Sequence, residues 1–162
     1  QLARALAAGP RVIVADEPAS SLDPAARDRL LALLHRTQQR HGHALLLISH
    51  DLVMLERWCH RVAVMLDGRL VELYRPDYVD HRRHPFARDL AAAIPTRASR
   101  LHGSGSPALG GPETNQQPPA DGCPDASRCD LVTPACRTRL PALRDLGDGH
   151  LLRCPEVDRH VR

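Results

Sequence analysis

The chain has 162 residues and a mass of 17.9 kDa, which suffices for one ordinary domain or a domain with an appendage but not for two full domains. The net charge of +3 is a mild excess and only 2% of the residues are aromatic, which argues against a nucleic-acid partner bound by charge or base stacking. All 22 basic residues are arginine, and no apolar run approaches the roughly 20 residues of a membrane span, so lysine-dependent chemistry and a transmembrane segment are both excluded.

The first predicted elements are a strand and a helix. The apolar, β-branched run at residues 11–15 predicts a buried parallel strand, and two acids, Asp16 and Glu17, follow at its carboxyl end. A helix is expected over residues 24–40, because Asp23 can cap it, proline suits its first turn and leucines recur along one face.

A second apolar run, at residues 44–48, follows after Gly42, which is expected to end the helix. The order strand, helix, strand predicts a right-handed crossover between two parallel strands. Ligands bind beyond the carboxyl ends of such strands, so we expect Glu17 and His50 to converge there.

The remaining elements are a helix near residues 51–59, a hairpin of strands at 62–66 and 69–73, and a helix from Pro85 to about residue 93. After Pro95 the composition shifts to glycine, serine and proline, and four cysteines then appear close together. We expect an α/β unit, a linker and a cysteine-rich extension, at residues 1–94, 95–121 and 122–162.

Two carboxylates beside an imidazole suit the hydrolysis of a nucleotide. One carboxylate can serve Mg²⁺, the second can orient or deprotonate the attacking water, and the imidazole can contact the γ-phosphate. The alternative is that Asp16 and Glu17 begin a solvated loop and that His50 caps the helix starting at Asp51. For either strand taken alone, the residues leave these two interpretations balanced.

Three linked motifs resemble those of ATP-binding-cassette (ABC) ATPases. Residues 11–18 resemble the Walker B segment, residues 20–23 the D-loop, and residues 48–51 the switch-histidine loop, in matching order and spacing. Residues 1–7 resemble the helix after the signature motif of that family. The resemblance covers residues 1 to about 75 and implies the C-terminal part of a P-loop NTPase, an α/β fold with a parallel sheet and flanking helices.

The resemblance also implies a role for each matched residue. Asp16 would serve Mg-ATP, Glu17 would be the catalytic carboxylate and His50 would sense the γ-phosphate. Ser20 and Asp23 would belong to the D-loop, with Asp23 facing a second ATPase subunit.

Other parts of such an ATPase are missing from this sequence. A phosphate-binding loop needs a lysine, which the chain lacks, and the adenine-stacking aromatic residue, the Q-loop and the signature motif are also absent. Because the chain begins at Gln1 without a methionine, we expect an intracellular piece of a longer protein. We expect the parent protein to bind and hydrolyse ATP, and this piece alone to do neither.

Residues 84–95 and the cysteine-bearing segment after them resemble the C-terminal region of dipeptide and oligopeptide importer ATPases. This implies an ATPase subunit that powers the import of such peptides, or of a related solute such as nickel. The subunit would be a peripheral protein on the cytoplasmic face of the membrane. The implied partners are a second ATPase subunit, identical or not, the membrane permease subunits and, indirectly, an extracytoplasmic solute-binding protein, with no nucleic acid.

Four thiols, at Cys123, Cys129, Cys136 and Cys154, lie in a segment with too little apolar surface to fold without a crosslink. Disulfides are disfavoured in the reducing cytosol. Zinc usually takes cysteines two residues apart, a spacing absent here, whereas a [4Fe–4S] cluster tolerates wider spacing. The family resemblance favours the cluster, and zinc or no metal remain open. Cys59 is predicted to pack as a small apolar residue.

Two rival functions remain. A non-transport ABC ATPase acting on DNA or ribosomes would share Asp16, Glu17 and His50, but would not be expected to carry residues 84–95 or the four-thiol tail. A non-catalytic module would use this truncated chain only for interaction or for holding a metal.

Overall fold

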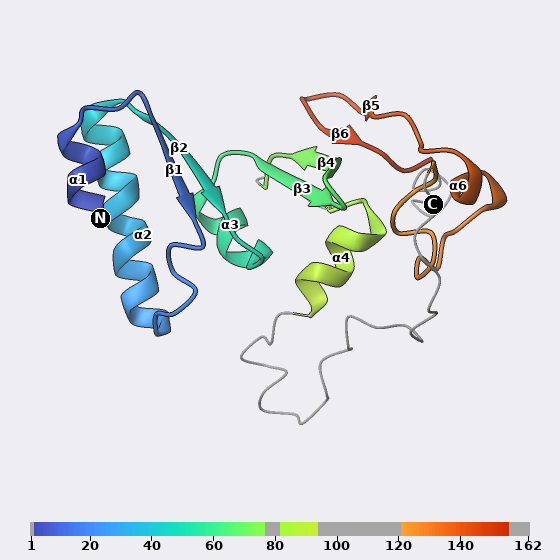
Figure 1. The fold of residues 1–162 in the computed structure, drawn as a ribbon, viewed down its shortest axis with the longest axis horizontal. Coiled ribbons are helices and arrows are strands. Elements are labelled where there is room, and N and C mark those ends of the chain that lie inside the picture. The colour runs from blue at the N-terminus through green and yellow to red at the C-terminus, as the bar shows by residue number, and fades with distance from the viewer. Residues whose placement is uncertain (1, 77–81, 94–120, 156–162) are drawn as a thin grey trace. The chain divides into compact units, whose positions relative to one another are not determined.

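The computed structural model describes residues 2–76, 82–93 and 121–155, and the chain divides into two compact units, Gln1–Trp58 and Cys59–Arg162. The helices, labelled as in Figure 1, are α1 (Leu2–Ala7), α2 (Pro24–His41), α3 (Leu52–Trp58), α4 (Pro85–Ala92) and α6 (Pro134–Thr138). The strands are β1 (Val12–Asp16), β2 (Ala44–Ile48), β3 (Val62–Leu66), β4 (Arg69–Tyr74), β5 (Arg144–Asp145) and β6 (Leu151–Leu152). In the described parts of the chain, no helix combines the length and the apolar character that crossing a bilayer requires.

Strands β1 and β2 form a parallel pair in the first unit, and Figure 1 shows them side by side. Their register sets Val12 opposite Ala44 and Asp16 opposite Ile48, so both strands end at the same level. Helix α2 connects them, which confirms the predicted strand, helix, strand order. The segments that follow the two strands therefore leave the sheet as neighbours.

Helix α2 begins and ends where the sequence predicts. The carboxylate of Asp23 accepts hydrogen bonds of 2.9 Å from the backbone amides of Ala25 and Ala26, two donors that the first turn cannot satisfy itself. Gly42 follows the last turn with φ of 70°, a left-handed conformation that glycine adopts without a steric penalty, and its amide donates to the Gln38 carbonyl at 2.8 Å.

The prediction that β1 is a buried strand is confirmed for only one of its faces. Ile13 is only 6% exposed, but its neighbours Val12 and Val14 are 56% and 59% exposed. Leu46 and Ile48 of β2 are also exposed, at 53% and 46%, on the face that the parallel register gives them in common with Val12 and Val14. Among the described residues this sheet has two strands and is covered on one face, so a continuous apolar run here alternates between buried and open positions.

The second unit contains an antiparallel sheet of four strands in the order β3, β4, β6, β5. Asp67 and Gly68 join β3 to β4 with φ of 49° and 69°, the left-handed pair that a two-residue hairpin favours, which confirms the predicted turn. Strands β5 and β6 come from the cysteine-rich segment and were not predicted. The predicted linker lies almost entirely outside the described residues, so the proposed domain boundaries stay predictions.

A buried carboxylate, that of Glu72 in β4, connects three segments of this unit. Its side chain is fully buried and accepts hydrogen bonds from the backbone amides of Arg83, at 2.7 Å, and His84, at 3.0 Å. Nε2 of His150, in the loop before β6, lies 2.8 Å from the same carboxylate. Glu72 thus holds the start of α4 and the β5–β6 hairpin against β4.

This burial predicts a pH dependence of stability. Desolvation raises the pKa of Glu72 above its ordinary value of 4.5, against the lowering effect of its hydrogen bonds. A group whose pKa is raised by folding stabilises the folded state fully at pH values below its pKa in the unfolded chain. That stability is lost as the pH rises through its pKa in the folded protein. Urea unfolding between pH 4 and pH 7 should therefore show wild type losing stability relative to Glu72→Gln as the pH rises.

The matched control is Asp148→Asn, which neutralises an exposed carboxylate at a left-handed position that asparagine tolerates. Its stability difference from wild type should vary less with pH than that of Glu72→Gln. Equal pH dependence in the two variants would contradict the role given to Glu72.

Candidate functional site

Glu17 follows the last residue of β1 in a left-handed conformation, with φ of 43°, which is uncommon for a residue with a side chain. Two contacts support this turn. Its amide donates to the carbonyl of Ile48 at 2.9 Å, which extends the β1–β2 pairing by one bond, and its carbonyl accepts from Oγ of Ser20 at 3.1 Å. The backbone at Glu17 is therefore held at the end of β2 as well as β1.

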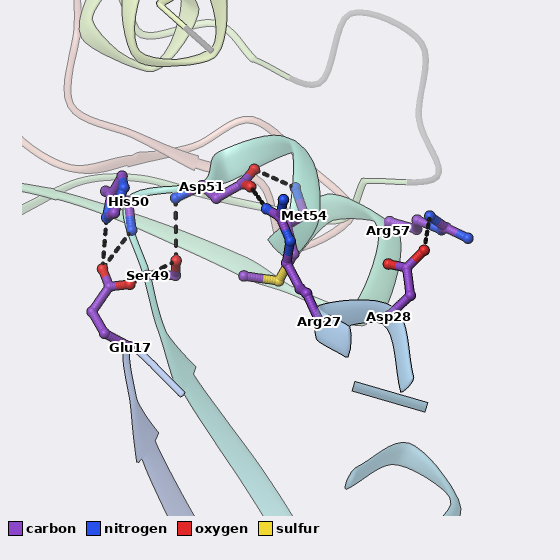
Figure 2. A network of polar contacts seen from close by, with 8 residues as sticks. All are labelled: Glu17, Arg27, Asp28, Ser49, His50, Asp51, Met54 and Arg57. Atoms are coloured by element: carbon purple, nitrogen blue, oxygen red, sulfur yellow. Dashed lines mark hydrogen bonds and ion pairs between the residues drawn. The ribbon is translucent and has the colours of Figure 1, made fainter. Parts of the chain in front are cut away.

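The carboxylate of Glu17 contacts the two residues that follow β2, as Figure 2 shows. Oε1 accepts from the backbone amide of His50 at 3.0 Å and lies 2.8 Å from Nδ1 of the same residue. Oε2 accepts from Oγ of Ser49 at 3.3 Å. The predicted convergence of Glu17 and His50 is thus confirmed, and the His50 side chain, 78% exposed, stays open to solvent.

These contacts hold the pKa of Glu17 below its ordinary value. The hydrogen bond from the His50 side chain is the largest cause, and the backbone amide of His50 and the Ser49 hydroxyl act in the same direction. Partial desolvation opposes them without reversing the shift. Glu17 is therefore an ionised hydrogen-bond acceptor at neutral pH, and its carboxylate already accepts three contacts from the loop after β2.

The other predicted site residues lie around this pair. Asp16 occupies the last position of β1 and is exposed. Ser20 bonds to the backbone carbonyl of Glu17, not to its carboxylate, and Asp23 uses its carboxylate to cap α2. The structure thus unites Glu17 and His50 directly, and places Ser20 and Asp23 in the turn between β1 and α2.

Two features of the loop were missed by the sequence analysis. The sequence analysis gave Ser49 no role, yet its hydroxyl donates to the carboxylate of Glu17. Asp51, not His50, caps α3: one oxygen accepts from the amide of Met54 at 2.9 Å and the other pairs with Arg27 of α2 (Figure 2). An aspartate just before an apolar helix is a sequence signal for a cap, whereas a partner 24 residues away carries none.

The second candidate site is a cavity in the second unit. Its walls include all four cysteines of the predicted metal set, namely Cys123, Cys129, Cys136 and Cys154. His84 and Arg153 also line it, and the other walls are apolar. All five cysteines lie within the described residues, and none forms a disulfide. In that same part of the chain, no three Cys, His, Asp or Glu side chains lie close enough together to ligate a metal ion.

Two of the thiols that line this cavity, those of Cys123 and Cys129, have environments that favour their protonated form. Burial raises the pKa of Cys123 and raises that of Cys129 to about 12. Such thiols are poor nucleophiles, because the thiolate is the reactive form. A bound metal cation reverses this preference, because a coordinating thiol is deprotonated.

Outside this set, Cys59 is half-buried, and burial raises the pKa of its thiol. This agrees with the packing role predicted for it.

No protein-family model matches the chain. Its curated homologues are ATP-binding proteins of ABC transporters for peptides and dipeptides, at 34–40% identity over most of the chain.

A putative peptide import ATP-binding protein of Brucella ovis is 38% identical over 154 residues, which cover 94% of this chain and 48% of the relative. A probable peptide ABC transporter ATP-binding protein of Sinorhizobium fredii is 40% identical over 162 residues, covering 99% of this chain and 44% of the relative. The dipeptide transport ATP-binding protein of Escherichia coli is 34% identical over 154 residues, which cover 94% of this chain and 46% of the relative. The chain thus spans about half the length of the curated relatives it matches.

The contact between Glu17 and His50 predicts the effect of removing the ring. His50→Ala deletes the side-chain hydrogen bond but keeps the backbone donor, so the pKa of Glu17 should rise toward its ordinary value. Ser49→Ala removes the smallest of the contributions that lower the Glu17 pKa and should therefore raise it less. Carbon-13 NMR titration of the glutamate carboxyl carbon measures both shifts, and an unchanged Glu17 pKa in His50→Ala would overturn the assignment.

Proposed function

We propose that this chain is part of the ATP-hydrolysing subunit of an ABC importer for dipeptides, oligopeptides or a related solute such as nickel. The observation that carries the proposal is the contact of Glu17 with His50 at the adjoining ends of two parallel strands. The printed names of the homologues support the transport class. On this proposal, β1 and β2 belong to the larger parallel sheet of a P-loop NTPase, with residues 11–18 as its Walker B segment.

In this proposal Glu17 acts as the base that orients the water attacking the γ-phosphate. An ionised carboxylate can accept a proton or a hydrogen bond from water, and the lone pairs of Oε2 not used by Ser49 remain for this task. The contact with His50 fixes the position of the carboxylate and uses one of its oxygens, so it restricts where that water can bind. The structure thus supports a base whose position is set by its neighbours on β2.

His50 would contact the γ-phosphate through Nε2, because Nδ1 faces Glu17. A ring that donates to Glu17 through Nδ1 and to a phosphate oxygen through Nε2 carries both protons and is cationic. Its exposure leaves Nε2 accessible to such a ligand. His50 would then lie between two anions, Glu17 and the terminal phosphate, and would report the presence of the phosphate to the β2–α3 loop.

Asp16 would serve Mg²⁺, for which an exposed carboxylate is a chemically suitable oxygen ligand. The metal, when bound, neutralises charge on the phosphates. The lysine-bearing phosphate loop and the signature motif would be supplied by sequence outside this chain, so the chain by itself would not turn over ATP. Ser20 and Asp23 would belong to the D-loop, with Asp23 facing a second ATPase subunit. Permease subunits would hold the assembly at the cytoplasmic face of the membrane.

We propose further that the four cysteines of the cavity hold a structural [4Fe–4S] cluster, with Zn²⁺ as the alternative occupant. Four thiols line one cavity, and thiolates are soft ligands of the kind that bind either group. Cys123 and Cys129 come from the turns after residue 121, Cys136 lies in α6 and Cys154 follows β6. Such a centre would crosslink an extension that otherwise has little regular secondary structure.

The catalytic assignment is tested in the full-length ATPase that contains this chain. Glu17→Gln should leave ATP binding intact and slow hydrolysis by roughly 100- to 10,000-fold, because a general base acts mainly in the transition state. Nucleotide binding and steady-state phosphate release measure the two effects. Asp67→Asn, the same chemical change in the β3–β4 turn, should hydrolyse ATP at the wild-type rate. Wild-type turnover by Glu17→Gln would show that another group is the base.

The metal centre is tested by purifying the chain anaerobically and measuring iron, acid-labile sulfide and zinc. We expect about four iron and four sulfide per chain for the cluster, or about one zinc for the alternative. Cys129→Ala should lose most of the metal, whereas Cys59→Ala, which changes a cysteine outside the cavity, should retain it. Wild type with none of the three elements would refute the centre.

A further inference from the structure

Arg27, near the start of α2, contacts the segments that follow both strands of the parallel pair. Its backbone amide donates to the carbonyl of Asp23 at 2.9 Å. Its side chain crosses to the loop after β2, where Nη1 donates to Oδ2 of Asp51, as Figure 2 shows. Because Asp23 caps α2 and Asp51 caps α3, the residue joins the starts of the two helices.

Asp51 uses its two carboxylate oxygens for different tasks. Oδ1 accepts from the amide of Met54 at 2.9 Å and caps α3, whereas Oδ2 pairs with Arg27. The cap fixes the carboxylate relative to its own helix, and the ion pair fixes it relative to α2. The side chains of Arg27 and Asp51 are 30% and 20% exposed, so this pair is partly shielded from water and stronger than a pair on an open surface.

Hydrogen bonds connect Asp51 to the carboxylate of Glu17. Oγ of Ser49 accepts from the amide of Asp51 at 3.2 Å and donates to Oε2 of Glu17 at 3.3 Å. The amide of His50, which lies between Ser49 and Asp51 in the chain, donates to Oε1 of Glu17 at 3.0 Å. The position of Asp51 therefore affects where Ser49 and His50 present their donors to Glu17.

A second ion pair joins the same two helices away from this loop (Figure 2). Nη1 of Arg57, in the last turn of α3, lies 3.4 Å from Oδ2 of Asp28, the residue after Arg27 in α2. Its side chains are 68% and 50% exposed, and exposed pairs of this kind contribute little to stability. The two pairs thus allow a comparison, because they have the same chemistry but differ in their distance along α3 from His50.

We propose that Arg27 is a positioning residue for ATP hydrolysis, and that its ion pair with Asp51 holds the loop of Ser49 and His50 against the carboxylate of Glu17. The inference rests on the function proposed above, in which Glu17 is the base and His50 contacts the γ-phosphate. Arg27 acts through the loop and does not itself touch the substrate.

The effect of Arg27 should fall on the chemical step and spare nucleotide binding. On the proposed function, the phosphate loop that grips ATP lies in sequence outside this chain, so the contact of Asp51 with α2 is not part of it. The placement of Glu17 and His50 matters most in the transition state, where a misplacement of about 1 Å can cost roughly 100-fold in rate. Loss of one of several contacts that place Glu17 should cost less than that.

Three variants separate the ion pair from the other roles of its two residues. Arg27→Met keeps a long, unbranched side chain that suits a helix but has no donor. Arg27→Lys keeps a cation, which can replace the guanidinium here because a single nitrogen makes the contact. Asp51→Asn keeps an oxygen that can cap α3 but removes the negative charge that pairs with Arg27.

The measurements are kcat and KM for ATP in the full-length ATPase that contains this chain, with urea unfolding to verify that each variant folds. We expect Arg27→Met to lower kcat about 10-fold and to change KM by less than about twofold. Arg27→Lys should recover most of kcat. Asp51→Asn should lower kcat to a similar extent, and the double variant should be no slower than the slower single variant, because both changes remove the same contact.

The matched control is Asp28→Asn, which breaks the exposed pair with Arg57 between the same two helices. It should keep the wild-type kcat and KM, because that pair does not act on the loop of His50. A loss of kcat in this variant equal to that in Arg27→Met would overturn the proposal, since any contact between the helices would then suffice.

The other outcomes separate this inference from the function on which it rests. Wild-type turnover by Glu17→Gln overturns the assignment of the base and the role of Arg27 together. Slow turnover by Glu17→Gln with a wild-type kcat in Arg27→Met overturns the role of Arg27 alone. Additive losses in the double variant, or a kcat in Arg27→Lys as low as in Arg27→Met, also overturn it. If Arg27→Met does not fold, a wild-type kcat in Asp51→Asn overturns it and a lowered one supports it.

Discussion

The parallel pairing of β1 with β2 is the constraint on which the candidate nucleotide site depends. Each strand is followed by a site residue that would not hold its position in isolation. Glu17 adopts a left-handed backbone that costs roughly 1–3 kcal/mol for a residue with a side chain, and His50 is largely exposed. The shared register joins them: the Glu17 amide bonds to Ile48, and its carboxylate bonds to the loop that follows. A shift of register by one residue would separate the pair.

A different constraint organises the second unit. The buried carboxylate of Glu72 accepts two consecutive backbone amides at the start of α4 and contacts the ring of His150. These contacts bring the cysteine-bearing segment, through β6, into the same sheet as the β3–β4 hairpin. They also fix the residue, His84, whose ring lines the four-cysteine cavity. In this unit one buried carboxyl group holds both the sheet and a wall of the four-cysteine cavity.

Local sequence signals were sufficient for the elements and for the central contact of the site. The ends of α2, at Asp23 and Gly42, were predictable because capping chemistry depends only on neighbouring residues. The contact of Glu17 with His50 was predictable because the ends of two paired parallel strands are neighbours. The face that β1 exposes was not predictable from the same run, because it depends on how many strands the sheet has.

The contacts between distant segments were also beyond the sequence. Strands β5 and β6 have two residues each, too few to show a period, and they form only by adding to β4. The segment at residues 84–95 was singled out for its family resemblance, yet nothing local indicates that the ring of His84 lines the cysteine cavity. Such placements follow from tertiary packing.

The open face of the β1–β2 pair affects how the isolated chain would behave in solution. Val12, Val14, Leu46 and Ile48 form a row of branched aliphatic side chains in contact with water. They lie beside a strand edge whose amides and carbonyls lack a neighbouring strand in the described part of the chain. Exposed apolar strand edges of this type can pair with strands from other molecules. Concentrated samples of the 162-residue polypeptide would accordingly tend to oligomerise through this sheet unless a covering segment or a mild detergent is supplied.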